Sequence, residues 1–331
     1  MKSKRFWKTA AMLILACGLA ACTGRSSGQA GSPAGADWPI KTVTFYVATS
    51  AGGATDLMAR QIADYFQRRF GKAFPVVNLS GSGGQIAMDA IMHSDADGSA
   101  FLFWHVSSLV SNVSGTLPLV IYNELDPVCI TVANDIMPLF VRADSDIKSF
   151  SDLAAKVRAN PGKIIFGGNT GAYPNILCLG LADAIGGSFT WVHTGDDSQN
   201  TAALLGGQVD IINQNYGLAR QYVDNGDWRV LGLLSDERSP NYPDISTAKE
   251  EGVNFSMPPF FYAIWGTRGT PRAVYDKFNE GIQELLKNNE MMASLNKLGF
   301  VYNYMPQDEA AKYMKDFHEG IQRFSSLFVK K

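Results

Sequence analysis

The sequence has no excess of positive charge, and this excludes one class of partner. Its 331 residues include 29 Lys and Arg against 31 Asp and Glu, so the formal net charge is -2. A protein that binds nucleic acid presents a basic surface, and this composition does not supply one. We therefore predict that no nucleic acid is a partner. Hydrophobic residues make up 46% of the chain, which is enough for a globular protein of two lobes.

Catalytic and cofactor motifs are also missing from the sequence. Ser80 and Ser82 lack glycines at the offsets of a nucleophile elbow, and Ile86 stands where a dinucleotide-binding loop needs its third glycine. The chain contains neither a Gly-Lys-Ser/Thr phosphate loop nor a His-Glu-x-x-His motif. The adjacent acids Asp196 and Asp197 are more typical of the first turn of a helix than of a metal site. We predict no cofactor, no metal and no catalytic residue.

Cysteine is scarce, with four in the whole chain. Cys17 and Cys22 lie near the N-terminus, in a segment that we do not assign to the fold. Cys129 and Cys178 remain, and they either pair as a disulfide or stay buried as two apolar thiols. Neither has a Cys-x-x-Cys or Cys/His spacing, so the sequence gives no redox or metal motif.

The N-terminus has only a short hydrophobic run. Basic residues precede an apolar stretch over residues 10–20, which is too short to span a membrane comfortably. It ends in Leu-Ala-Ala-Cys, which looks like a bacterial lipobox with Cys22 as the lipidated residue. We predict a lipoprotein signal peptide over 1–22 and a flexible tether over 23–37, with an ordinary signal peptide cut near Ala21 as the alternative. The mature protein is then periplasmic or otherwise extracytoplasmic, and it is held at a membrane by its lipid.

The most informative stretch joins a strand pattern to a helix pattern. Val43, Phe45 and Val47 alternate as in a strand, and an apolar helical pattern begins at Leu57. The loop between them contains Gly52-Gly53, so it can present backbone N–H groups and the positive end of a helix to an anion. An ordinary strand-to-helix turn without a ligand is the plainer interpretation.

A second Gly/Ser loop strengthens the first interpretation. The strand pattern over 74–78 runs into residues 80–84, Ser-Gly-Ser-Gly-Gly, and a helix pattern follows. The carboxyl ends of neighbouring parallel strands lie at one edge of a sheet, where ligands of open α/β sheets bind. We expect the two loops to lie side by side at that edge.

The rest of the chain alternates strands and helices, which predicts an α/β fold with mostly parallel sheets. The expected helices beyond the second loop include 150–159, 175–185, 199–205, 245–252, 272–288, 291–298 and 307–328, and the expected strands include 100–104, 127–132, 137–141, 163–166, 189–192, 209–212, 228–235 and 260–267.

Histidines and aromatic residues divide by position. His105 and His193 follow strands at the edge that carries the loops, so they are candidates for ligand contact. His93 and His318 fall in helical surface patterns, and we expect them to be solvated. The aromatic group Phe260, Phe261, Tyr262 and Trp265 is predicted to build a core or a hinge.

With these loops placed, the sequence resembles the Bug or TctC-like family, the extracytoplasmic solute-binding proteins of tripartite tricarboxylate transporters. The resemblance extends over residues 38–324. The motifs that carry it are Ala51-Gly52-Gly53-Ala54-Thr55-Asp56, Gly81-Ser82-Gly83-Gly84, Asp126-Pro127-Val128, Asn160-Pro161-Gly162-Lys163, Leu204-Leu205-Gly206-Gly207-Gln208-Val209-Asp210 and Gly269-Thr270-Pro271.

The resemblance implies a periplasmic-binding-protein (venus-flytrap) fold, in which two α/β lobes are joined by two crossover strands. Lobe 1 would comprise residues 38–134 and 259–331, and lobe 2 residues 135–258. It implies a small organic carboxylate as ligand, membrane permease subunits as partners, and a monomer. Two other functions stay open: a secreted lipoprotein enzyme using His105 or His193 as a base, and a ligand-binding receptor linked to a sensor.

The resemblance also implies which residues bind the ligand. In the first loop they are Ser50, Ala51, Gly52, Gly53 and Ala54, and in the second Ser82, Gly83 and Gly84. We also expect His105, at the edge that carries the loops, to contact the ligand. From the second lobe we expect Thr170, Gly171, Asn175, Thr194 and Gln214, and the last three stand where the sequence departs from the family pattern. Asp56 is expected to bond loop amides rather than the anion, because like charges repel.

Overall fold

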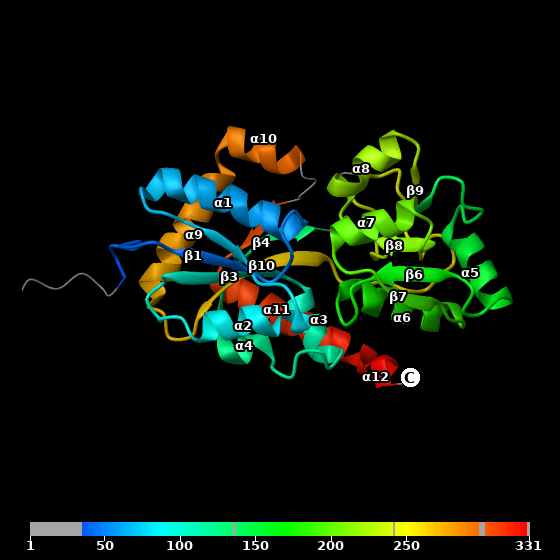
Figure 1. The fold of residues 1–331 in the computed structure, drawn as a ribbon, viewed down its shortest axis with the longest axis horizontal. Coiled ribbons are helices and arrows are strands. Elements are labelled where there is room, and N and C mark those ends of the chain that lie inside the picture. Colours follow the sequence, from blue (N-terminus) through cyan, green and yellow to red (C-terminus); the bar gives the residue numbers. More distant parts are fainter. Residues whose placement is uncertain (1–34, 135–136, 241, 298–301, 330–331) are drawn as a thin grey trace, which may run out of the picture. The chain divides into compact units, whose positions relative to one another are not determined.

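The computed structural model describes residues 35–134, 137–240, 242–297 and 302–329 (Figure 1). The predicted signal peptide, the lipidation site Cys22 and most of the tether lie outside these residues. In the part of the chain that is described, no helix combines the length and the apolar character needed to cross a membrane.

The strands form two sheets. Six belong to the first, in the order β11-β4-β10-β3-β1-β2, and five to the second, in the order β7-β6-β8-β5-β9. The strands are β1 (Thr44–Val47), β2 (Val76–Asn78), β3 (Ala100–His105), β4 (Leu125–Asn134), β5 (Leu139–Arg142), β6 (Ile165–Gly168), β7 (Thr190–His193), β8 (Ile211–Asn213), β9 (Trp228–Gly232), β10 (Phe260–Thr267) and β11 (Tyr302–Met305).

The helices cover both faces of each sheet. Figure 1 shows α1 and α9 on one face of the first sheet and α2 and α11 on the other, while α7 and α8 lie opposite α5 and α6 on the second sheet. The helices are α1 (Ala54–Phe70), α2 (Gln85–Met92), α3 (Ser107–Val113), α4 (Ile121–Glu124), α5 (Phe150–Ala159), α6 (Tyr173–Ile185), α7 (Asp197–Leu205), α8 (Tyr216–Asp224), α9 (Arg272–Leu286), α10 (Asn289–Lys297), α11 (Gln307–Ile321) and α12 (Ser325–Val329), with short 3₁₀ turns at η1 (Ser82–Gly84) and η2 (Gln322–Phe324).

The chain passes between the sheets twice. It leaves the first sheet after β4, builds the second from β5 to β9, and returns as β10. Because the returning strand runs antiparallel to both β3 and β4, and β5 runs antiparallel to both β8 and β9, both sheets are mixed. The expectation of mostly parallel sheets is therefore wrong at these strands. β1 does pair in parallel with β2 and with β3, so the two Gly/Ser loops leave neighbouring parallel strands.

An aromatic core holds α1 and α9 against the first sheet. Phe45 of β1 and Phe66 of α1 lie edge to face with ring centroids 6.1 Å apart, and Phe278 of α9 lies 4.9 Å from Phe66. All three side chains are completely buried. A buried aromatic side chain of this size stabilises a core by about 1.5–3 kcal/mol. The packing therefore holds the C-terminal half of α1 against β1, and the first loop joins this strand to the start of the helix.

Several predicted elements are confirmed and others are not. Helix α5 and strand β10 have the predicted bounds, and Ser149 caps α5 by accepting a hydrogen bond from the Asp152 N–H at 3.0 Å. The predicted helix over 307–328 is broken into α11, η2 and α12, and Gly320 lowers helix propensity just before the break. Helix α8 and strand β11 were not predicted.

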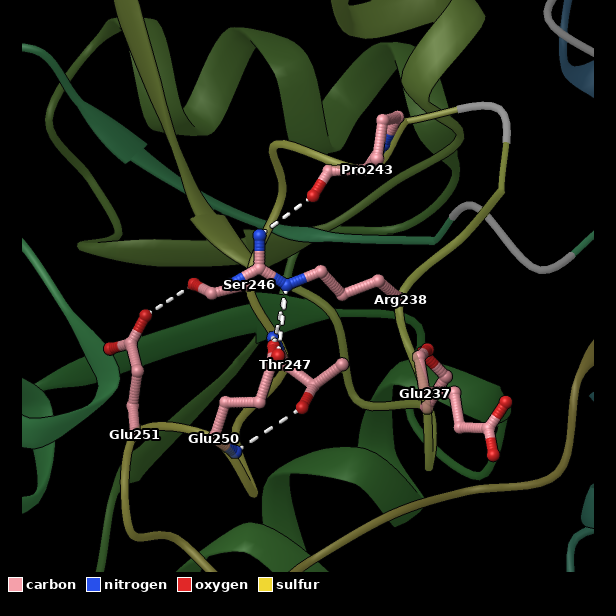
Figure 2. Close-up of polar contacts among 8 residues, drawn as sticks. Glu237, Arg238, Pro243, Ser246, Thr247, Glu250 and Glu251 are labelled. Carbon is pink, nitrogen blue, oxygen red and sulfur yellow. Dashed lines mark hydrogen bonds and ion pairs between the residues drawn. The ribbon is translucent and has the colours of Figure 1, made fainter.

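The predicted helix over 245–252 is wrong, because its start and stop signals fall within one turn. Figure 2 shows the hydrogen bonds around the start of this turn. Glu250 accepts a hydrogen bond from the Thr247 N–H while the Thr247 hydroxyl accepts from the Glu250 N–H, as in a capping box. Gly252, at φ +83°, then ends the turn, and the Val253 N–H bonds back to the Ala248 carbonyl. Arg238 donates to both carboxylate oxygens of Glu250, which holds the turn in place.

His318 is buried rather than solvated, which corrects the expectation from its helical pattern. Only 4% of it is exposed, on the face of α11 that packs against α3. Its Nδ1 lies 2.8 Å from the Tyr122 hydroxyl and its Nε2 lies 3.1 Å from Asn112 Oδ1. Burial lowers the pKa of His318, and the ring is a neutral hydrogen-bonding group within the fold. His93, at the end of α2, is exposed as expected.

Candidate ligand-binding site

A cavity of about 450 Å³ opens where the two Gly/Ser loops face residues of the second sheet. Small-molecule sites typically enclose about 300–1,000 Å³, so the cavity suits a small metabolite. From the first sheet and its loops, the lining includes Thr49, Ser50, Gly53, Ala54, Thr55, Ser80, Ser82, Gly83, Gly84, Trp104, His105, Ser107, Phe260 and Tyr262. From the second sheet and its loops, it includes Asn169, Thr170, Ala172, Pro174, His193, Asp196, Asp197, Gln199, Asn200, Asn213 and Asn215.

The first loop opens the N-terminus of α1 toward the cavity. Gly53 is the N-cap, with extended backbone and no side chain to bond the first helical N–H groups. Ser50, Gly53 and Ala54 line the cavity, whereas the predicted Ala51 and Gly52 do not. The Gly52 N–H is used inside the loop, where it donates to Asp56 Oδ2 at 2.9 Å.

Asp56 organises the base of this loop. It is only 1% exposed and accepts further hydrogen bonds from Arg60 Nε at 3.0 Å and from Asn78 Nδ2 at 2.9 Å. Burial alone would raise the pKa of Asp56, but the bonds from Arg60, Gly52 and Asn78 outweigh it and hold the pKa below its usual value. Because Asn78 ends β2, Asp56 ties the first loop to the strand that leads into the second.

The second loop turns back on itself in a conformation that only small residues adopt. Ser82, Gly83 and Gly84 all have positive φ, and all three line the cavity. A Cβ on Gly84 would come within 1.8 Å of the Trp104 ring, so this position requires glycine. The close approach seats the loop directly on the end of β3.

His105 ends β3 in the cavity wall as a neutral ring. Its Nδ1 accepts from the Ser107 N–H at 3.2 Å, and its ring lies 5.0 Å from that of Phe260. Burial lowers the pKa of His105 to about 4. Phe260, Phe261, Tyr262 and Trp265 are buried in β10 as expected, and the structure adds that Phe260 and Tyr262 also line the cavity.

The loops of the second sheet form the opposite wall. His193 Nδ1 accepts from the Thr170 N–H at 3.1 Å, and both residues line the cavity. Gly171 lies just behind, where its N–H donates to Asn175 Oδ1 at 3.0 Å. The hydroxyl of Ser114, the residue that follows α3, donates to the Gly171 carbonyl at 3.0 Å. This wall is therefore hydrogen-bonded to the end of α3, which packs beside the first sheet.

Besides Ala51 and Gly52, four predicted residues do not line the cavity: Gly171, Asn175, Thr194 and Gln214. Asn175 bonds Gly171, Thr194 bonds Asn200, and Gln214 Nε2 donates to Thr201 Oγ1 at 3.0 Å. Asn213 and Asn215 line the cavity in place of Gln214. Side chains alternate between the two sides of an extended chain, so the neighbours of Gln214 point the other way. The alternation of side chains along an extended chain, applied at the end of β8, would have predicted Asn213 and Asn215 as the cavity-lining pair.

Asp196 and Asp197 begin helix α7, as predicted. Asp196 is the N-cap, and Gln199 accepts a hydrogen bond from its N–H at 3.0 Å. Asp197 Oδ2 accepts from the Ala54 N–H at 3.3 Å and so reaches the N-terminus of α1. Burial, and then the charge of Asp196, raise the pKa of Asp197 against the effect of the Ala54 bond. Among the described residues, no group of three His, Cys, Asp or Glu side chains is arranged to hold a metal ion.

The structure has two mixed sheets covered by helices, and the chain passes between them twice. Loops of both sheets line one cavity. This is the architecture of the two-lobe receptors with the periplasmic-binding-protein fold. The chain belongs to the tripartite tricarboxylate transporter family receptors (TctC), whose family model matches residues 58–326. Receptors of this family are periplasmic. The fold and the family predicted from the sequence are both confirmed.

Individual relatives agree over most of their length. Protein BugT of Bordetella pertussis is 27% identical over 302 residues, which cover 89% of this chain and 91% of BugT. The solved structure of MatC from Rhodopseudomonas palustris with bound malate is 25% identical, covers 88% of this chain and 100% of that one, and has a TM-score of 0.76. A second R. palustris protein, Rpa4515 with adipate, is 22% identical, with coverage of 88% and 98% and a TM-score of 0.79, and shows the shared fold.

Proposed function

We propose that this protein captures a small organic carboxylate in the cavity between its two sheets and delivers it to the membrane permease subunits of a tripartite tricarboxylate-type transporter. The observation that carries the proposal is the N-terminus of α1, which opens into the cavity with glycine as its N-cap. Such an end offers the N–H donors of its first turn and a partial positive charge to an anion. MatC, a relative over nearly its whole length, has malate bound in its structure.

The rest of the wall supports binding rather than catalysis. In the described residues, the recorded ring bonds of His105 and His193 are to backbone N–H groups and not to a Ser, Thr or acid oxygen. A base that activates a nucleophile needs such an oxygen within about 3 Å. We therefore infer that the protein is a receptor and not an enzyme, and no observation favours a sensor-linked role over transport.

The proposal includes the location of the receptor. We infer that residues 1–22 are a lipoprotein signal peptide, that Cys22 carries a lipid, and that a tether over 23–37 lets a monomeric receptor work at the periplasmic face of a membrane. Residues 38–134 with 259–331 would move as one lobe and residues 135–258 as the other. Labelling with a radioactive fatty acid, lost in Cys22→Ser, tests the anchor.

Ligand capture is tested by thermal unfolding with a panel of organic acids. A ligand that binds only the folded state raises stability by RT ln(1 + [L]/Kd), which is about 2.7 kcal/mol at a hundred times Kd. We expect at least one small carboxylate to raise the unfolding temperature by several degrees. The proposal would be contradicted if sugars or cations raised the unfolding temperature and no carboxylate did.

A matched pair of variants places the binding at the helix end. Thr55 lies in the first turn of α1 and lines the cavity, and proline is tolerated in a first turn, as Pro174 is in α6. Thr55→Pro removes an N–H of the helix end other than the Ala54 N–H, which already donates to Asp197 Oδ2, whereas Thr55→Val removes only the hydroxyl. We expect Thr55→Pro to weaken carboxylate binding by about ten-fold, the effect of one charge-assisted hydrogen bond, and Thr55→Val to have a smaller effect.

A further inference from the structure

We propose that Asp197 makes the cavity selective for a carboxylate whose other end carries a protonated amine, that is, a small zwitterion, over a dicarboxylate. The inference rests on the proposed function, and it assigns the specificity of the same site. Asp197 would bind the ammonium group while the Gly/Ser loops hold the carboxylate.

The position of Asp197 is fixed by its contact with the first loop. Its Oδ2 accepts from the Ala54 N–H at 3.3 Å, so the carboxylate lies beside the helix end where an anionic ligand group would bind. Its other oxygen, Oδ1, has no hydrogen-bond partner among the described residues. Tyr262 lines the same cavity, and burial, then the charge of Asp197, raise the pKa of its hydroxyl well above the ordinary value. Asp197 therefore presents an unused acceptor to the cavity.

No protein cation balances this carboxylate. The residues that line the cavity in the described part of the chain include neither lysine nor arginine. Two histidines contribute to the wall, but His105 is neutral because burial lowers its pKa to about 4, and His193 Nδ1 accepts a hydrogen bond from the Thr170 N–H. The neighbouring acid, Asp196, is the N-cap of α7. Among the described residues that line the cavity, an ionised Asp197 thus has the helix end of α1 but no cationic side chain beside it.

A second hydrogen-bond acceptor in the same wall also favours a ligand with N–H donors. Asn213 is 1% exposed, and its Nδ2 donates to the carbonyls of Met137 and Pro138 at 2.6 and 3.2 Å. These two bonds fix the orientation of the amide, so the atom left without a partner is the acceptor Oδ1. Asn213 lines the cavity opposite the Gly/Ser loops. A buried acceptor without a donor is costly, and an N–H group of the ligand would satisfy it.

The charges then decide which ligands fit. A dicarboxylate would bring a second negative charge into a small cavity that already holds Asp197, and like charges in close contact repel. A ligand of the same length with an ammonium group in that place gains a charge-assisted hydrogen bond instead. Such a bond contributes about 10- to 100-fold in affinity.

Length-matched pairs of ligands test the proposal by titration calorimetry at pH 7. The pairs are succinate with 3-aminopropanoate and glutarate with 4-aminobutanoate, which differ only in the second end group. For the wild-type protein we expect the amino acid of the better-fitting pair to bind at least about ten-fold more tightly than its dicarboxylate. Asp197→Asn should abolish this preference, while Asp224→Asn, which removes the same charge at an exposed position of α8 outside the cavity, should preserve it.

Three results would overturn the proposal. One is a wild-type protein that binds the dicarboxylate as tightly as the amino acid or more tightly, which needs no variant to interpret. Another is a preference that survives Asp197→Asn and Asp197→Ser in folded protein. The third is a preference for the amino acid that grows from pH 7 to pH 5 in the wild type, because protonation of Asp197 should weaken it. In each case carboxylate binding itself persists and the proposed function stands; binding of no acid at all contradicts both.

Discussion

At the scale of single residues, His105 shows how a buried titratable group sets the response to pH. The ring is packed against Phe260 and bonded through Nδ1 to the Ser107 N–H, so the folded protein holds it neutral. In the unfolded chain a histidine takes up a proton near its ordinary pKa of about 6.5. The two states therefore bind different numbers of protons between about pH 6.5 and pH 4.

We predict that the free energy of unfolding falls as the pH is lowered through this window. Because the folded pKa of His105 is about 4, its contribution is fully present above pH 6.5 and is lost toward pH 4, with an upper limit of about 3 kcal/mol. Denaturant titrations from pH 7 to pH 4 of the wild type and His105→Gln would measure it. The variant should show a shallower loss, and the exposed His93→Gln is the control. An unchanged slope in His105→Gln would contradict the assignment.

The residues around the cavity also show what sequence reasoning reaches. Gly53, Ala54, Ser82, Gly83 and Gly84 could be predicted, because a strand pattern, a glycine pair and a helix start determine a loop locally. Asn213 and Asn215 were missed in favour of Gln214, since which member of a polar run faces a cavity depends on where β8 ends. Asp197 was read as a helix start only. Its contact with Ala54 joins residues 143 apart, which no local pattern records.

At the scale of elements, the first loop and α1 act as one unit with β2 through Asp56. The carboxylate collects hydrogen bonds from Gly52, Arg60 and Asn78 while it is almost completely buried. Removing one partner from such a group leaves the others unpaired inside the protein. The unit is therefore sensitive to a single change at its centre.

We predict that Asp56→Ala lowers the free energy of unfolding by about 3 kcal/mol, because the charge-assisted bonds are lost and the Gly52 N–H is left without its acceptor. Asp64→Ala supplies the control in the same helix. Asp64 also pairs with an arginine four residues on, Arg68, but both side chains are more than half exposed, so its loss should cost about 0.5 kcal/mol or less. Equal losses in urea denaturation would show that burial of Asp56 contributes nothing.

Element boundaries were predictable where the signals stand apart. Ser149 starts α5 and Asn160-Pro161-Gly162 ends it ten residues later, and the predicted helix agrees with the observed one. Between Thr247 and Gly252 the same kinds of signal lie five residues apart. Each is satisfied locally, and the chain makes a single bonded turn (Figure 2). A pattern that contains a start and a stop does not predict how much helix lies between them.

At the scale of the whole molecule, the end of the chain packs against the elements of the second sheet. Phe324, in the turn after α11, lies 6.1 Å from the ring of Phe255. Both rings also contact Gly180 of α6, where a Cβ would come within 2.4 Å of Phe255. The C-terminal segment thus connects helices of the first sheet with α6.

We predict that Phe324→Ala lowers the free energy of unfolding by about 3 kcal/mol, the usual cost of removing a buried aromatic ring. Lys315→Ala, at an exposed position of α11 whose ion pair with Glu319 spans 4.0 Å, should cost less than about 0.5 kcal/mol. Guanidinium titrations of Phe324→Ala and Lys315→Ala measure the difference. A loss below 1 kcal/mol for Phe324→Ala would indicate that the C-terminal segment contributes little to the fold.

Cys129 and Cys178 are two buried thiols whose positions allow them to report on local opening of the fold. Cys129 lies on β4 and Cys178 on α6, and both are free, buried and raised in pKa by that burial, so the structure places them as two separate thiols rather than a disulfide. A buried thiol reacts with an alkylating reagent only when the structure around it opens. In a variant with the other cysteine replaced by serine, the alkylation rate therefore measures how often that region opens. The chain carries one such native reporter beside each sheet, so ligand-induced tightening can be timed in the two halves without attaching any label to the cavity.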